Sequence, residues 1–129
     1  MTAVDTNVIV RLLTYDDIKQ ATQASSIFAT EEVWIAKTVL LETVWVLSSL
    51  YGFGEKNVRG AIALLLGLPN VRMEDRAAVD QALSLVDHGL EFADALHLAS
   101  APDGARFVSF DRAFIRRSRR AGVPGVSDR

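Results

Sequence analysis

The sequence contains no cysteine among its 129 residues. This absence excludes a disulfide framework and a thiolate metal site, and it is compatible with a reducing cytoplasm. No apolar run approaches the ~20 residues that a membrane-spanning helix needs. No signal peptide is evident, because Asp5 interrupts the apolar start of the chain. We therefore expect a cytoplasmic protein that does not associate with membranes.

Internal repeats, low-complexity tracts and linkers are also lacking. A chain of 129 residues, half of them hydrophobic, fits one domain with a real core, so we expect a single domain over residues 1–129. The net charge is only −2, but it is unevenly distributed. Residues 106–129 carry seven Arg and two Asp, a net charge of +5, whereas residues 1–105 carry −7. This asymmetry predicts a polarised surface whose basic part contacts phosphates.

Hydrophobic periodicity and turn residues predict strands that alternate with helices, which is typical of an α/β domain with a short, mostly parallel sheet. The expected strands are 2–5, 33–36, 71–73, 106–110 and 123–126. The expected helices are 6–14, 17–30, 38–52, 55–66, 75–89, 92–101 and 111–120, with Thr38 as the N-cap of the third.

Four acidic residues occur in apolar surroundings. Asp5 and Asp111 each follow an apolar strand, while Glu42 lies in TVLLETVWVL and Asp94 in FADALHLASA. A buried carboxylate is costly unless it is paired or binds a metal. Because ligands bind beyond the carboxyl ends of parallel strands, Asp5 and Asp111 are expected to share one crevice.

A cluster of four carboxylates would repel itself, and a hard divalent cation such as Mg²⁺ or Mn²⁺ relieves this repulsion. Such a cation can activate water and stabilise the leaving oxygen of a phosphodiester. Metal-assisted phosphodiester hydrolysis is therefore a candidate function, although many phosphoryl-transfer enzymes share these ligands.

Each acid also has a simpler interpretation. Asp5 and Asp111 could be N-caps of the helices that follow them. Glu42 could pair with a buried Lys37 or Arg11.

The helix around Asp94 is ambiguous as well. Asp94 could face solvent together with Glu91 and His97, which lie at a spacing of three on one side of the helix. His97 could assist a proton transfer, but a structural role is the commoner outcome, and His88 is expected at the surface.

A basic stripe directly follows the last acid and comprises Arg112, Arg116, Arg117, Arg119 and Arg120. Its simplest interpretation is a solvated helix face. All five side chains are positively charged and directly follow the predicted site, which favours phosphate contact instead. The RNA-binding candidates are Arg112, Arg116, Arg117 and Arg120.

The segments AVDTNVIVRLL, TVLLETVWVL, FADALHLASA and FVSFDRAF, in this order, resemble a PIN domain and, more narrowly, the VapC toxin family of bacterial toxin–antitoxin modules. The resemblance covers Val4 to Ala113. It implies a three-layer α/β/α fold with a short, mostly parallel central sheet. It also implies a Mg²⁺- or Mn²⁺-dependent endoribonuclease that cuts structured RNA such as tRNA or rRNA, pairs with a VapB-type antitoxin and forms a homodimer.

The resemblance assigns roles to particular residues. It implies that the catalytic and metal-binding residues are Asp5, Glu42, Asp94 and Asp111, with Asp111 either on a second metal or orienting the attacking water. Thr6, Asn7 and Ser109 are the implied supporting residues, which hold carboxylates or waters by hydrogen bonds.

Two other functions are compatible with the sequence. One is a non-catalytic PIN-like module whose acids bind a structural metal or a basic partner. The other is a Mg²⁺-dependent phosphatase of the haloacid-dehalogenase type, which Asp5-Thr6-Asn7 loosely resembles, but Asn7 cannot replace the second aspartate of that motif. Segments 17–30 and 55–66 are amphipathic, and Val58, Ile62, Leu65 and Leu66 could form either core or a partner-binding patch.

Overall fold

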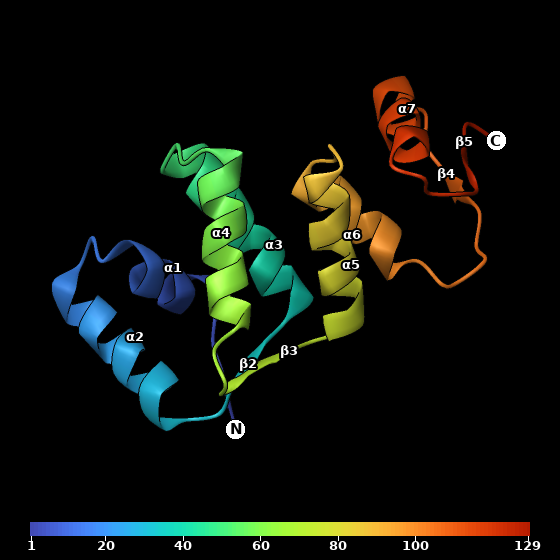
Figure 1. Cartoon of the computed structure of the whole chain (residues 1–129). Helices are drawn as coiled ribbons and strands as arrows, with labels where there is room; N and C mark the ends of the chain where they lie inside the picture. Colours follow the sequence, from blue (N-terminus) through green and yellow to red (C-terminus); the bar gives the residue numbers. More distant parts are fainter. The chain divides into compact units, whose positions relative to one another are not determined.

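The computed structural model describes all 129 residues as two compact units, Met1–Arg76 and Ala77–Arg129 (Figure 1). The N-terminal unit contains β1 (Thr2–Ala3), α1 (Thr6–Thr14), α2 (Ile18–Thr30), β2 (Val33–Ile35), α3 (Lys37–Trp45), the π-helix η1 (Val46–Leu50), α4 (Glu55–Leu66) and β3 (Val71–Met73). Beyond β3 follow α5 (Arg76–Asp87), α6 (Phe92–Ser100), β4 (Phe107–Val108), α7 (Arg112–Arg120) and β5 (Val126–Ser127).

A parallel sheet of order β1-β2-β3 forms the centre of the N-terminal unit. Val33 of the middle strand is paired with Thr2 on one side and with Val71 on the other. Val33 and Ile35 are fully buried, so both ends of the middle strand lie in the core. The predicted α/β class with a short parallel central sheet is confirmed.

The helices of this unit begin where side chains can cap them. Asp17 accepts a hydrogen bond from the Gln20 N–H at 3.0 Å and so starts α2. Tyr15 adopts a left-handed conformation, φ 54°, which ends α1 and turns the chain into α2. Helix α1 packs against α2 and α3. This packing places the start of α1, directly after β1, close to α3.

Helix α3 begins differently from the prediction. Ala36, not Thr38, is its N-cap residue and has no capping side chain. The backbone N–H of Lys37 instead donates to Glu74 Oε1 at 2.8 Å, so a residue that follows β3 satisfies this helix start. The helix also changes to π-helical geometry before residue 52, with the Tyr51 N–H bonded to the Val46 carbonyl. A cap supplied from a distant segment has no local sequence signal.

The C-terminal unit has its own two-stranded parallel ladder, β4-β5. Strand β5 lies at Val126–Ser127 and not at 123–126, because Pro124 has no N–H to donate and Gly125 turns with φ 76°. Strand β4 does not hydrogen-bond to the three-stranded sheet. The expectation that Asp5 and Asp111 follow strands of one sheet is therefore wrong.

The apolar face of α4 belongs to the core. Val58, Ile62, Leu65 and Leu66 are each at most 4% exposed, so these side chains do not form a partner-binding patch. None of the helices has the length and hydropathy that a membrane span requires.

Candidate functional site

Asp5 stands between β1 and α1, directly after the buried Val4. Its Oδ1 accepts a hydrogen bond from the Val8 N–H at 3.2 Å, which makes it the N-cap of α1. The simpler interpretation of Asp5 is thus correct. It does not compete with the functional one, because the cap uses a single oxygen and fixes the direction of the other.

Glu42 lies in the second turn of α3, where its Oε1 accepts a hydrogen bond from the Thr6 hydroxyl. Thr6 is 6% exposed and is the first residue of α1. This bond links the first turn of α1 to α3, and it brings Glu42 to the residue that follows Asp5. Thr6 thus holds a carboxylate by a hydrogen bond, and the structure shows that this carboxylate is Glu42. Asn7 is exposed.

Neither Lys37 nor Arg11 neutralises Glu42. The Lys37 Nζ lies 3.0 Å from Asp75 Oδ2, and Arg11 Nη1 lies 3.2 Å from Asp16 Oδ1. The proposed ion pair of Glu42 is therefore wrong.

Asp94 lies in the first turn of α6 and is half-buried. Burial raises the pKa of its carboxyl above the ordinary value, and the neighbouring charges of Glu91 and Asp111 raise it further. His97 and Arg117 act in the opposite direction. The charge of Asp111 on α7 is thus one of the charges that act on Asp94 of α6.

Asp111 is the N-cap of α7, and its Oδ1 accepts from the Phe114 N–H at 3.1 Å. Its own backbone N–H donates to the Ser109 hydroxyl at 3.0 Å. Ser109 therefore supports Asp111 through the backbone rather than through the carboxylate. The tilted ring contact of Phe107 with Phe114 joins β4 to the same turn.

The four acids are less buried than their apolar sequence neighbours indicate. Asp5, Glu42 and Asp111 are exposed, and only Asp94 is half-buried. The expectation of a desolvation cost is therefore wrong for the first three. For Glu42, helix geometry is the reason, because Leu40 and Thr43 on the buried face of α3 leave Glu42 on another face.

Each unit thus holds two of the acids, Asp5 with Glu42 and Asp94 with Asp111. Neither unit alone assembles three or more His, Asp or Glu side chains that could hold a metal ion. The convergence of all four on one pocket stays a prediction. The donors themselves fit a hard divalent cation, because all are carboxylate oxygens.

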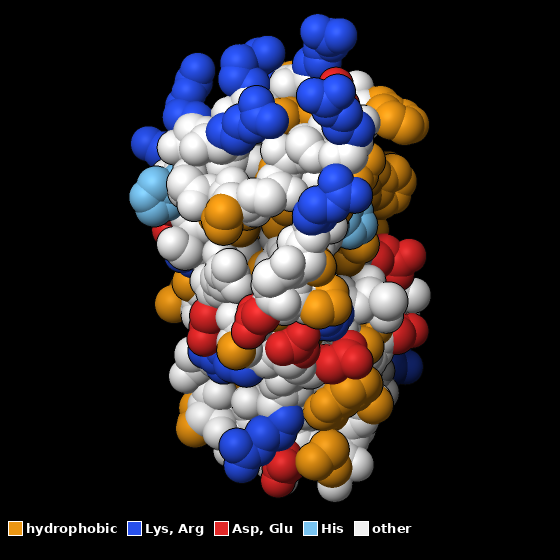
Figure 2. Space-filling view, turned by 90° about the vertical axis from the view of Figure 1, so that its right-hand side faces the viewer, with side chains coloured by type: hydrophobic (Ala, Val, Ile, Leu, Met, Phe, Trp, Pro, Cys, Tyr) orange, Lys and Arg blue, Asp and Glu red, His pale blue; other side chains and the backbone are white.

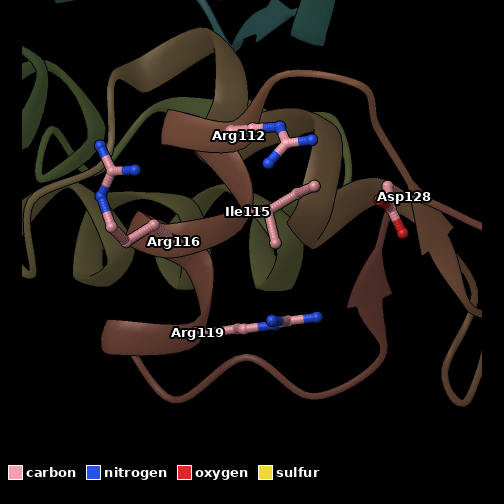
Figure 3. A pocket seen from close by; sticks show the side chains of 5 residues that line it. All are labelled: Arg112, Ile115, Arg116, Arg119 and Asp128. Carbon is pink, nitrogen blue, oxygen red and sulfur yellow. The ribbon is translucent and has the colours of Figure 1, made fainter.

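The basic stripe of α7 divides into two faces. Arg112, Arg116 and Arg119, with Ile115 and Asp128, line a cavity of about 420 Å³ beside α7 (Figure 3). Arg117 and Arg120 do not line it. Arg119 was not among the RNA-binding candidates, but it lines this cavity. It lies three residues after Arg116 and seven after Arg112, and this helical spacing could have predicted that the three side chains share one face.

A polar network in the N-terminal unit was not foreseen. The Tyr51 hydroxyl donates to Asp16, and Arg11 Nη1 donates to Asp16 and, at 3.1 Å, to the Tyr51 oxygen. These bonds tie the α1–α2 turn to the end of η1. The Tyr51 bond is the largest cause that holds the pKa of Asp16 below its usual range, followed by the Thr14 hydroxyl.

The sequence matches the family described as PIN domain over residues 2–120. The chain therefore belongs to the PIN-domain family, whose members are generally nucleases. The predicted three-layer α/β/α fold class is confirmed. A comparison with curated protein sequences gives no match.

Proposed function

We propose that this PIN-domain protein is a metal-dependent endoribonuclease and the toxin of a VapBC-type toxin–antitoxin module, which hydrolyses phosphodiester bonds of structured RNA such as tRNA or rRNA. One observation carries the proposal. Each unit holds two of the acids: Asp5 precedes Thr6, whose hydroxyl binds Glu42, and the charge of Asp111 contributes to the raised pKa of Asp94.

Mg²⁺ or Mn²⁺ is the cofactor of the proposed reaction, held by Asp5, Glu42, Asp94 and Asp111. These ligands are oxygen atoms only, as both ions prefer. When bound, the cation would activate water and stabilise the charge that develops on the phosphodiester oxygens.

The chain's own residues have definable tasks in this proposal. The cap bonds of Asp5 and Asp111 fix one oxygen of each carboxylate against a helix N-terminus and aim the other away from it. The Thr6 hydroxyl fixes the rotamer of Glu42. Pre-set carboxylates do not have to be ordered when substrate arrives, which lowers the barrier.

Exposed apolar side chains of the N-terminal unit support a protein partner. Ile18, Trp45, Leu50 and Leu64 are between 57% and 77% exposed, which is unusual for such large apolar residues. A VapB-type antitoxin and a second copy of the chain are the partners that we propose for these exposed side chains.

Purified protein free of antitoxin should cut total RNA at discrete positions with Mg²⁺ or Mn²⁺ and not with EDTA, as mapped by 5′-end sequencing. Asp5→Asn should abolish cleavage while the fold persists, because asparagine is an equally good N-cap but a poor cation ligand. The matched control is Asp103→Asn, which makes the same change at an exposed loop acid.

Undiminished, metal-dependent cleavage by Asp5→Asn would refute the assignment of the site. Release of phosphate from a monoester would favour the haloacid-dehalogenase-like phosphatase instead. Loss of both activities in metal-replete protein would favour the non-catalytic binding module.

A further inference from the structure

A hollow lies between one face of α7 and the segment around β5. Figure 3 shows Arg112 and Arg119 extending from α7 towards the side on which Asp128 lies, with Ile115 between them, while Arg116 extends away from Asp128. With about 420 Å³, the cavity is large enough for a phosphate group with part of its nucleotide. All the lining residues belong to the C-terminal unit.

The guanidinium groups of this hollow are not neutralised within the chain. Arg112 and Arg116 have no ion pair, although they lie one helical turn apart, where like charges destabilise a helix. Arg119 donates its Nε–H to the Val126 carbonyl at 3.3 Å, and this bond leaves the charge of the group uncompensated. Viewed from the side on which Figure 1 draws α7, Lys and Arg side chains stand out from the surface (Figure 2). Arg112 and Arg119 extend to the same side of the cavity and are placed to receive an anion, while Arg116 adds positive charge at another part of its lining.

Arginine favours a particular anion. Its planar fork matches two oxygens of a phosphate, and the apolar Ile115 offers a surface to a sugar or base. Helix geometry turns Arg117, which acts on Asp94, to a different side of α7 from Arg112 and Arg119. Within the C-terminal unit, the hollow and Asp94 are therefore served by different arginines of α7.

We propose that this hollow is a phosphate-binding subsite that holds a phosphodiester of the RNA away from the scissile bond, and that Asp128 weakens its grip. The inference rests on the proposed ribonuclease function for the identity of the ligand. Asp128 forms no ion pair with the arginines, so its carboxylate lowers the local potential without closing the site. A lower affinity for the phosphodiester would help an enzyme to release its product.

Fluorescence anisotropy of a short labelled single-stranded RNA, measured in EDTA over a range of salt concentrations, tests the subsite independently of cleavage. Arg112→Gln and Arg116→Gln should each weaken binding about ten-fold at low salt, since a charge-assisted bond is lost. Each should also lower the slope of log K against log salt by about 0.7. Asp128→Asn should tighten binding about three-fold, as expected for removal of one exposed charge.

Lys19→Gln and Lys56→Gln provide matched controls, because both remove a positive charge from an exposed position of the N-terminal unit. The controls should bind RNA as the unmodified protein does. Arg119→Lys separates the contribution of positive charge from that of bidentate hydrogen bonding, because lysine keeps the charge but lacks the planar guanidinium group.

The proposal is overturned if the Arg112 and Arg116 variants bind RNA with unchanged affinity and salt slope, or if the lysine controls weaken binding equally. It is also overturned if the arginine variants lose only the ability to bind inorganic pyrophosphate, because the hollow would then serve a small phosphate compound. Loss of RNA binding in these variants supports the subsite even if the protein cuts no RNA, so the two proposals fail separately.

Discussion

Replacing Thr6 with valine removes one hydroxyl and preserves the shape of a buried side chain. Thr6 is 6% exposed at the first residue of α1, and its hydroxyl donates to Glu42 Oε1 on α3. Thr6→Val therefore breaks one bond between two helices and leaves the apolar packing intact. It tests whether this bond both stabilises the fold and positions Glu42.

The size of the effect follows from the environment of the bond. A hydrogen bond to a charged group contributes about 1.5–3 kcal/mol to stability. Glu42 is exposed and can regain water, so the loss should lie at the lower end, about 1–1.5 kcal/mol. For a chain of this size, the melting temperature should fall by about 4–6 °C.

A double-mutant cycle isolates this bond from other consequences of the substitution. Thr6→Val, Glu42→Ala and the double variant should give a coupling free energy of about 1 kcal/mol in urea unfolding. Thr43→Val is the control, because Thr43 is also buried but its hydroxyl donates to the Val39 carbonyl within α3. Its cycle with Glu42→Ala should be additive.

Additive effects of Thr6→Val and Glu42→Ala would refute the reasoning, because two residues joined by a bond cannot change independently. Cleavage assays add a second criterion. If Thr6 positions Glu42, Thr6→Val should lower kcat more than it changes KM. A change in KM alone would assign Thr6 to RNA binding.

Three further predictions concern charge and packing. In EDTA at pH 7, Asp94→Asn should raise the melting temperature by about 2 °C, because a carboxyl with a raised pKa destabilises the fold when it is ionised. The gain should vanish at low pH, where the carboxyl is protonated, and an equal gain at all pH values would contradict the prediction. Tyr51→Phe should reduce stability at neutral pH but not below the folded pKa of Asp16, because the hydrogen bond from Tyr51 stabilises only the ionised carboxylate. Melting temperatures of the variant and the unmodified protein, measured across the acid range, should therefore converge at low pH, and a constant difference between them would contradict the prediction. Leu40→Ala, at a fully buried position of α3, should cost about 2–5 kcal/mol in urea unfolding, and a cost near zero would mean that the site is not packed.

Local signals account for what sequence reasoning recovered. The helices at 6–14 and 55–66 have the predicted bounds, because their periodicity and their flanking cap and glycine residues lie within a few positions of each end. The cap roles of Asp5 and Asp111 have the same origin, since a strand–Asp–helix junction is short. The supporting roles that the family resemblance implies for Thr6 and Ser109 stay predictions.

The sequence alone thus determined the fold class and the order of the elements, since both depend on residues close together in the chain, and the four acids as site residues stay a prediction. Only the tertiary structure decided the rest. Glu74 starts α3 from a distant segment, Thr6 binds Glu42 across two helices, and β4 pairs with β5 instead of the central sheet. These outcomes depend on which segments meet in space, and the free energy of such contacts is set by burial and geometry that no local pattern encodes.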